Sequence, residues 1–261
     1  MLTFPQIDPV LFSFGPVKVR WYGLMYVLGF ISSYYLVLSQ IKKKKLVDLE
    51  VHFENINFIL ILSLIVGGRL GYVLFYNFNY YLNNPSEILA TWQGGMSFHG
   101  ALICTVLAGV VFCWKKNLNF WASADVYCAT VPIGLGLGRL GNFINAELFG
   151  RVTDVPWGMV FPGGGPYPRH PSQLYEAFLE GVCLFILLWK LKDKQLPTGY
   201  TVAFFLLFYG IFRSFVELFR EPDIQIGFLF AHVTMGQLLS SIMIVSGLVI
   251  IVMRRRKPGT N

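Results

Sequence analysis

Long apolar stretches, separated by short polar or basic segments, run through the whole chain. Each approaches or reaches the length of about 20 residues that a helix needs to cross the hydrocarbon core of a bilayer. We therefore predict an all-α integral membrane protein with seven transmembrane helices, numbered as spans one to seven, over residues 21–41, 56–76, 96–114, 122–142, 172–191, 199–218 and 234–253.

The composition supports a membrane protein. Of 261 residues, 55% are hydrophobic and 13% are charged, whereas soluble domains carry about 25% charged residues. A soluble protein of this composition would expose large apolar patches. We expect one transmembrane domain over residues 1–261.

Basic residues predict the orientation. Lysines and arginines cluster directly after spans one, three, five and seven, and these clusters hold 13 of the 21 basic residues. Because loops on the cytoplasmic side are enriched in Lys and Arg, the N-terminus is predicted outside and the C-terminus in the cytoplasm. Residues 143–171, rich in Gly and Pro, then form an outer-side (periplasmic) connection between spans four and five.

A glycine-rich stretch at the end of span four carries an unusual set of polar side chains. Arg139, Asn142, Asn145 and Glu147 fall within nine residues. Ionisable groups in or near hydrocarbon are costly and mark functional sites by default. On a helix Arg139 and Asn142, three residues apart, share one face, with Asn145 close to it.

Span six ends with a second charged set. Arg213, Glu217 and Arg220 are spaced i, i+4 and i+7 and are predicted to share one helix face. One reading is an ion-pair ladder that satisfies itself. The other is a site with more positive charge than its acid can neutralise, which together with Arg139 binds an anion. Arginine suits phosphate because its planar fork donates two parallel hydrogen bonds, and the phosphate available in a membrane is a lipid headgroup.

Three further side chains need an interpretation, and the first two have two readings each. His99, near the outer end of span three, is either a packing residue or a group for proton transfer near neutral pH. Tyr22 belongs either to the aromatic belt at the interface or to a headgroup site. Arg69 lies within Gly67-Gly-Arg-Leu-Gly71, a pattern that allows close helix contact, and is expected to be paired inside the bundle.

Other chemistries are excluded by pattern. The four cysteines lie in or beside apolar runs without a C-x-x-C pair, and no two histidines have metal-ligand spacing. We expect free thiols, no metal and no cofactor. Residues 136–141 match G-x-G-x-x-G, but a dinucleotide fold needs a preceding strand, and here the flanks are membrane helix.

The polar motifs together resemble those of the bacterial prolipoprotein diacylglyceryl transferases. The resemblance covers nearly the whole chain, and its blocks occur in the order of the family, at residues 21–26, 94–100, 138–150, 169–176 and 219–223.

The resemblance implies seven spans in the inner (cytoplasmic) membrane with the active site toward the outer side. It implies transfer of the diacylglyceryl group of phosphatidylglycerol to the lipobox cysteine thiol of a prolipoprotein. A thioether forms and glycerol-1-phosphate is released, as the first step of lipoprotein maturation. The expected partners are phosphatidylglycerol, the prolipoprotein signal peptide and the lipid bilayer, with no nucleic acid.

Site residues follow from the same resemblance, position by position. The predicted catalytic residues are Tyr22, His99, Arg139 and Arg213, with His99 or Tyr22 assisting the thiol proton. The predicted substrate-binding residues are Arg139, Asn142, Glu147, Gly150, Glu176, Glu217 and Arg220.

We hypothesise that Arg139 binds the lipid phosphate, Arg213 stabilises the departing phosphate and Asn142 holds the headgroup glycerol. Glu147 and Glu217 would orient the arginines. Two other functions remain open from the residues alone. An anion transporter or channel would also use an arginine-rich interior, although no internal repeat is visible. A different phospholipid-headgroup transferase is the second.

Overall fold

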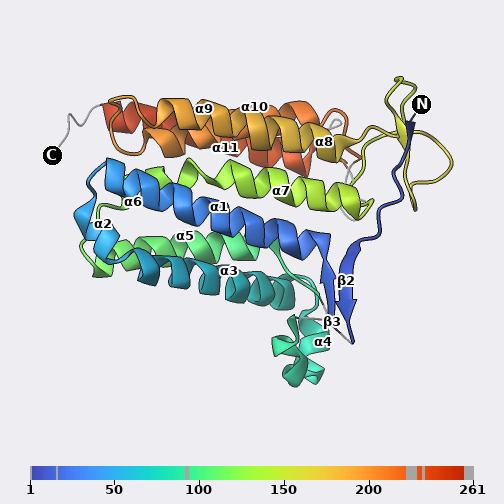
Figure 1. The fold of residues 1–261 in the computed structure, drawn as a ribbon, viewed down its shortest axis with the longest axis horizontal. Coiled ribbons are helices and arrows are strands. Elements are labelled where there is room, and N and C mark those ends of the chain that lie inside the picture. Colours follow the sequence, from blue (N-terminus) through green and yellow to red (C-terminus); the bar gives the residue numbers. More distant parts are fainter. Residues whose placement is uncertain (1, 16, 92–93, 222–227, 231–232, 256–261) are drawn as a thin grey trace. The chain divides into compact units, whose positions relative to one another are not determined.

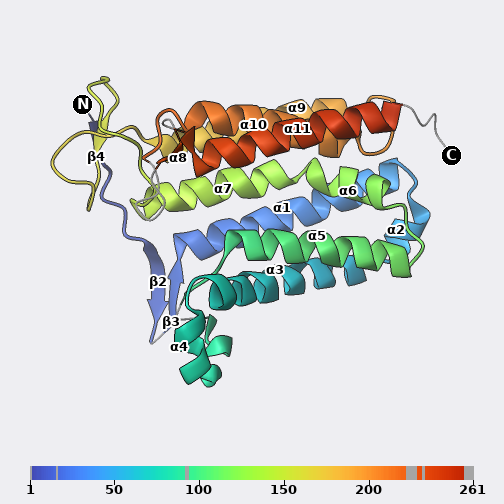
Figure 2. The ribbon, with the colours of Figure 1, turned by 180° about the vertical axis from the view of Figure 1, so that it is seen from behind.

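The computed structural model of the chain describes residues 2–15, 17–91, 94–221, 228–230 and 233–255 (Figures 1 and 2). It is mostly helical. The helices are α1 (Trp21–Lys43), α2 (Val47–Val51), α3 (Phe53–Phe75), α4 (Phe78–Asn83), the 3₁₀ turn η1 (Pro85–Leu89), α5 (Phe98–Lys115), α6 (Phe120–Cys128), α7 (Val131–Ile144), α8 (Ser172–Glu176), the π-helical η3 (Ala177–Cys183), α9 (Leu184–Leu191), α10 (Tyr200–Val216) and α11 (Met235–Arg255).

Short strand pairs accompany the helices. β1 (Leu2–Thr3) pairs in parallel with β4 (Met159–Val160). The antiparallel pairs are β2 (Val10–Phe14) with β3 (Val17–Arg20), and β5 (Phe228–Phe230) with β6 (Val233–Thr234).

The prediction of an all-α membrane protein is confirmed. Among the described residues, five helices are long and apolar enough to cross a membrane: α1, α3, α5, the α6–α7 pair and α11. Predicted span five is the consecutive series α8, η3 and α9, and predicted span six is the 17-residue α10. The total of seven spans and their orientation stay predictions.

Local chemistry explains where span four is divided. Pro132 lies in the first turn of α7, where its missing N–H costs no helical hydrogen bond. A continuous helix would place the proline ring against the carbonyl four residues earlier. The chain therefore turns at Ala129 and Thr130, and the Thr130 hydroxyl donates back to the Tyr127 carbonyl at 2.8 Å.

Contacts between backbone positions divide the chain into two compact units, residues 41–123 and residues 1–40 with 124–261. In the first unit, α3 and α5 lie side by side (Figures 1 and 2). Glycines allow this close approach, since a Cβ on Gly71 would lie 2.8 Å from the Gly100 Cα. The expected close packing of the Gly67–Gly71 motif is thus confirmed.

In the second unit, α7 packs against α8 and η3, and α10 packs against α11. Gly136 of α7 meets Gly181 of η3 so closely that a Cβ on Gly181 would lie 2.7 Å from the Gly136 Cα. The glycines of span four therefore serve helix packing, as the sequence predicts. This packing brings the polar residues of α7, α8 and α10 together.

A buried carboxylate fixes the start of α10. Asp125 of α6 accepts hydrogen bonds from the backbone N–H of Gly199 at 2.6 Å and of Val202 at 3.0 Å. Because the first N–H groups of a helix lack partners within the helix and carry partial positive charge, a carboxylate there is doubly favourable. Asp125 therefore ties α6 to the N-terminus of α10.

Replacing Asp125 with Ala is expected to lower the free energy of unfolding by about 2 kcal/mol, because two buried N–H groups lose their acceptor. Thermal unfolding of the detergent-solubilised protein measures the change. Asp48→Ala, at an exposed aspartate of α2, is the control and should cost less than about 0.5 kcal/mol. Equal losses in both variants would contradict the role of Asp125.

Candidate functional site

One oxygen of Glu176 lies at the centre of an arginine cluster. Glu176 Oε2 is 2.6 Å from Arg139 Nε and 2.7 Å from Arg213 Nη1, and 4.0 Å from Arg220 Nη1. The Glu176 side chain, at the end of α8, is completely buried. Residues from three separate parts of the chain, in α7, α8 and the end of the α10 region, thus meet at one carboxylate.

Arg213 is held from its other side as well. Its Nη2 lies 2.8 Å from Glu217 Oε2. The other oxygen of Glu217 accepts a hydrogen bond of 3.0 Å from the hydroxyl of the buried Thr234. Two carboxylates therefore fix the orientation of the Arg213 guanidinium. Hydrogen bonds between charged groups, as here, are stronger than those between neutral groups.

A chain of amide contacts continues from Arg139 in the other direction. Arg139 Nη1 donates to Asn142 Oδ1 at 3.4 Å, as the shared helix face predicts. Asn142 and Asn145 both donate to Glu147 Oε1, at 2.8 and 3.2 Å. Polar contacts are therefore continuous from Glu147 through Arg139 and Glu176 to Arg213 and beyond.

The turn that carries Glu147 is strained. Ala146 and Leu148, on either side of Glu147, have φ of 54° and 58°, a left-handed conformation that costs a non-glycine residue about 1–2 kcal/mol. Buried Gln173 and Ser172 hold the turn by donating to the carbonyls of Glu147 and Leu148, at 2.7 and 3.1 Å. Such strain, held by surrounding bonds, is typical of functional sites.

Gly150 lies where three backbone segments meet. It forms an isolated antiparallel bridge with Arg220, and its N–H donates to the His170 carbonyl at 2.8 Å. A Cβ here would collide with the Phe219 carbonyl oxygen and would lie 2.7 Å from the His170 Cβ. Only glycine fits, and this explains its place in the predicted site.

The expectation that Arg220 continues the helix face of Arg213 and Glu217 is wrong. α10 ends at Val216, with Glu217 as its C-cap, because the following residues turn to pair with residues 150 and 151. The Arg151 N–H donates to the Phe219 carbonyl at 2.8 Å. The Arg220 guanidinium still approaches Glu176, but from a bridge between loops.

The charged set contains more carboxyls than the sequence reading counted. Glu180, one turn after Glu176, is completely buried and faces the same cluster, with Oε1 3.8 Å from Arg213 Nη1. The carboxyls of Glu176, Glu180 and Glu217 therefore all lie among the guanidinium groups of Arg139, Arg213 and Arg220. Anion binding at this cluster stays a prediction.

Sequence reasoning missed four residues that support the site: Glu180, Arg151, Gln173 and Thr234. Glu180 had a signal, since a carboxyl four residues after Glu176 in an apolar run calls for a partner. Gln173 lies within the motif block at residues 169–176, and Arg151 is a basic residue outside the cytoplasmic clusters, but nothing in the sequence indicated their partners or pointed to Thr234. Arg151 donates to the carbonyls of Arg220 at 2.9 Å and Glu217 at 3.5 Å, and this depends on how the loops fold.

The comparison with known proteins identifies the family. A family model described as prolipoprotein diacylglyceryl transferase matches residues 9–253. The chain belongs to this family. The resemblance of its motifs is thereby confirmed.

Relatives of this family match over nearly the whole chain. The phosphatidylglycerol–prolipoprotein diacylglyceryl transferase of Desulfotalea psychrophila is 58% identical over 94% of this chain and 93% of its own length. Those of Geobacter sulfurreducens and Pasteurella multocida are 52% and 49% identical, over 99% and 98% of this chain and 100% and 96% of their own lengths.

In this family member, Tyr22 lies next to the arginine cluster. Its ring packs on α7, such that a Cβ on Gly141 would lie 2.8 Å from the ring. The charges of Glu147 and Arg139 also act on its hydroxyl. The Tyr22 hydroxyl is 3.0 Å from the Tyr26 hydroxyl.

His99 is the second residue of α5 and belongs to the other unit, residues 41–123. Its side chain is exposed, and its ring makes a T-shaped contact with Phe98 at 5.8 Å. No hydrogen bond to His99 occurs among the residues that the structure describes. A role as a hydrogen-bonded packing residue is therefore not supported, and its place at the arginine cluster stays a prediction.

Another histidine, His170, lies in the connection between α7 and α8 and accepts the Gly150 N–H at its carbonyl. Its Nδ1 is 3.1 Å from the Tyr175 hydroxyl, and its ring packs against Phe219. Partial burial lowers the pKa of His170 below its usual range, although the nearby Asp154 carboxylate opposes this. A neutral His170 suits its packing role beside Gly150.

Part of one motif block lies outside the described residues, namely Pro222 and Asp223. All four cysteines are described, and all are free.

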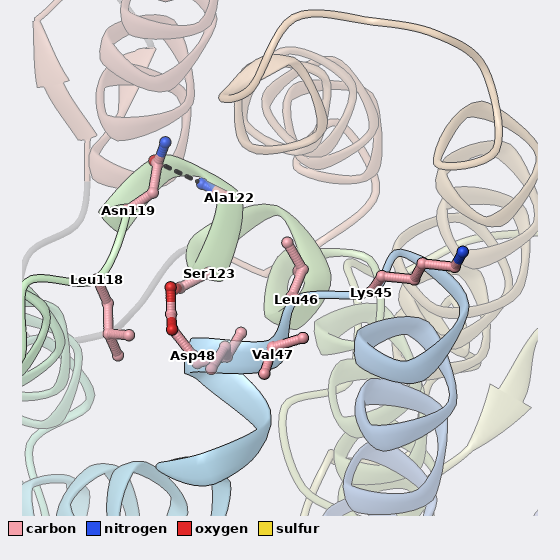
Figure 3. A pocket seen from close by; sticks show the side chains of 9 residues that line it. Lys45, Leu46, Val47, Asp48, Leu118, Asn119, Ala122 and Ser123 are labelled. Atoms are coloured by element: carbon pink, nitrogen blue, oxygen red, sulfur yellow. Dashed lines mark hydrogen bonds between the residues drawn. The ribbon is translucent and has the colours of Figure 1, made fainter. Parts of the chain in front are cut away.

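A cavity of 220 Å³ lies elsewhere, in the unit of residues 41–123 (Figure 3). It is lined by residues 45–49, 118, 119, 122 and 123. Figure 3 shows the Asp48 and Ser123 side chains pointing toward each other there. None of the predicted site residues lines it.

Gly150→Ala is expected to destabilise this family member by about 1–3 kcal/mol, because the added methyl group pushes the Phe219 carbonyl away and opens the bridge to Arg220. Thermal unfolding measures the loss. Gly138→Ala is the matched control, since a Cβ at Gly138 meets no atom within 4 Å and alanine favours helix. A Gly150→Ala variant as stable as Gly138→Ala would contradict the tight packing.

Proposed function

We propose that this chain is a phosphatidylglycerol–prolipoprotein diacylglyceryl transferase. The names of relatives at 49–58% identity over nearly the whole chain carry the proposal. The arginine–glutamate cluster supports it, because the reaction needs a site for a lipid phosphate. An anion transporter is not favoured by any relative reported above.

The chemistry is a displacement at carbon. The sulfur of the lipobox cysteine loses its proton to a base and attacks the glyceryl carbon that bears the phosphate. The carbon–oxygen bond breaks, its electron pair stays on the phosphate oxygen, and glycerol-1-phosphate leaves as the thioether forms. The protein must therefore supply a proton acceptor and stabilise a phosphate that gains negative charge.

Arg139 and Arg213 are the groups for the phosphate. Both donate to the same oxygen of Glu176, at 2.6 and 2.7 Å, so a phosphate oxygen at that position would meet two guanidinium groups. Glu176 Oε1 has no hydrogen-bond partner among the described residues. In our proposal Glu176 keeps the two arginines together until the lipid phosphate competes for them.

The remaining substrate-binding residues shape the headgroup site. Asn142, held by Glu147, binds the headgroup glycerol through its amide. Glu217 orients Arg213, and Gly150 lets the outer-side connection close against Arg220. His99 or Tyr22 accepts the thiol proton, directly or through a water molecule.

The membrane arrangement belongs to the same proposal. Seven spans, with the N-terminus outside and the C-terminus in the cytoplasm, place the basic clusters on one side. The protein is then a multi-pass protein of the bacterial inner membrane, with its site toward the outer side. The signal peptide of the prolipoprotein, an apolar helix, enters between spans from the bilayer.

Arg139→Ala is expected to lower kcat/KM for phosphatidylglycerol by at least about 100-fold, because one of two phosphate donors is lost. Arg139→Lys should lose nearly as much, since an ammonium group lacks the planar fork. The assay uses phosphatidylglycerol and a lipobox peptide without ions or nucleotides, and measures the thioether product and the released glycerol phosphate.

Arg254→Lys is the matched control for this assay. Arg254 donates to Thr198 at the start of α10, away from the cluster, and its variant should keep wild-type transfer. Wild-type activity in Arg139→Ala would exclude the phosphate role of Arg139. A wild-type protein that forms no thioether would refute the proposed function itself.

His99→Gln is expected to lower kcat by about 100-fold if the imidazole accepts the thiol proton, because general base catalysis contributes roughly that factor or more. The same assay measures kcat, and thermal unfolding confirms folding. Tyr22→Phe tests the alternative acceptor. Full activity in folded His99→Gln, together with a loss in Tyr22→Phe, would transfer the role to Tyr22.

A further inference from the structure

Arg69 has an environment that its sequence context did not predict. It lies in the last third of α3 and is 4% exposed. Buried arginines normally pair with carboxylates. No carboxylate pairs with Arg69 among the described residues. The partners of its side chain there are backbone carbonyls.

Four carbonyl oxygens accept hydrogen bonds from this one side chain. Arg69 Nε donates to Ile88 at 2.7 Å and Nη2 to Glu87 at 2.7 Å, while Nη1 donates to Gly94 at 2.6 Å and Gly95 at 3.1 Å. The guanidinium also lies 5.2 Å from the centre of the Tyr81 ring. With these donors engaged, Arg69 holds a loop and is not placed to bind an anion.

The same segment of α3 holds the start of α5. The Ser97 N–H donates to the Gly68 carbonyl at 2.8 Å, and the Ser97 hydroxyl caps α5 by accepting from the Gly100 N–H at 3.2 Å. Gly100 in turn packs on Gly71. Arg69 therefore fixes residues 94 and 95, and its neighbours fix residues 97 and 100.

His99 lies within this fixed turn. It is the second residue of α5, between Ser97, which is bonded to Gly68, and Gly100, which packs on Gly71. Its exposed ring has no hydrogen bond of its own among the described residues, so the backbone alone sets where the imidazole is presented.

We propose that Arg69 is a positioning residue for His99. By binding the carbonyls of Gly94 and Gly95, the guanidinium sets the path of the chain into α5 and so the place of the imidazole. Lysine cannot replace it, because its compact ammonium group cannot reach the separate carbonyls that the planar guanidinium contacts with three nitrogens. The expected change in kcat rests on the proposed function, whereas the placement of the imidazole does not.

The kinetic test is a double-mutant cycle with Arg69→Lys and His99→Gln in the thioether assay. If Arg69 acts through His99, Arg69→Lys lowers kcat about ten-fold in the wild-type background, since small misplacements of a reacting group are costly. It lowers kcat less than about two-fold in the His99→Gln background. KM for phosphatidylglycerol should stay within about two-fold in both.

A second readout needs no activity. An imidazole-acylating reagent modifies His99, and mass spectrometry follows the rate in the wild type and in Arg69→Lys. The His99 rate should change at least about three-fold, whereas that of His52, at the start of α3 in the same unit, should not. Equal changes at both histidines would indicate general loosening and would overturn the proposal.

Two controls complete the design. Arg254→Lys removes an arginine contact to the Thr198 carbonyl and should change kcat equally in the wild-type and His99→Gln backgrounds. Should Arg69→Lys fail to fold, Gly95→Ala disturbs the contact from the loop side, because its Cβ would lie 2.6 Å from the Tyr72 ring and 2.9 Å from Arg69 Nη1, at a φ of 77° that strains alanine. Additive effects on kcat with an unchanged His99 rate overturn the inference. A wild type without transfer activity refutes the proposed function and leaves the labelling test decisive.

Discussion

The carboxylate of Glu176 holds two guanidinium groups on one oxygen, and the site depends on this contact. Taking an arginine out of water costs several kcal/mol unless partners with good geometry compensate, such as a carboxylate or, for Arg69, a set of carbonyls. Arg139 on α7 and Arg213 on α10 therefore both require Glu176, at 2.6 and 2.7 Å. The polar faces of α7, α8 and α10 must then meet, and the glycine contact between α7 and η3 allows them to do so.

The contacts of Glu176 have a consequence for the proposed function. Its carboxylate already holds Arg139 and Arg213, so in that proposal a lipid phosphate competes with Glu176 for both arginines. The strained turn at Ala146 and Leu148 and the bridge at Gly150 hold Glu147 in place, and Glu147 in turn accepts from Asn142.

The arginines of the cluster show what helix spacing predicts and where it fails. The (i, i+3) spacing placed Arg139 and Asn142 on one face, because a helix fixes the direction of neighbouring side chains. The same logic failed for Arg220, since α10 ends at Val216 and loop pairing with Gly150 sets its position. Glu180 is a carboxyl in an apolar run, but only the structure shows that it lies 3.8 Å from Arg213 Nη1.

The sequence by itself determined the class of the protein, most of its helices and the family, because hydropathy and motif order are properties of the chain alone. It also singled out the residues of the cluster, since charges in apolar segments are rare. Only the tertiary structure decided which charges pair, that Arg69 binds carbonyls instead of an acid, and that Arg151 supports the end of α10. These contacts join residues far apart in the chain, and their geometry depends on how loops close, which local patterns do not encode.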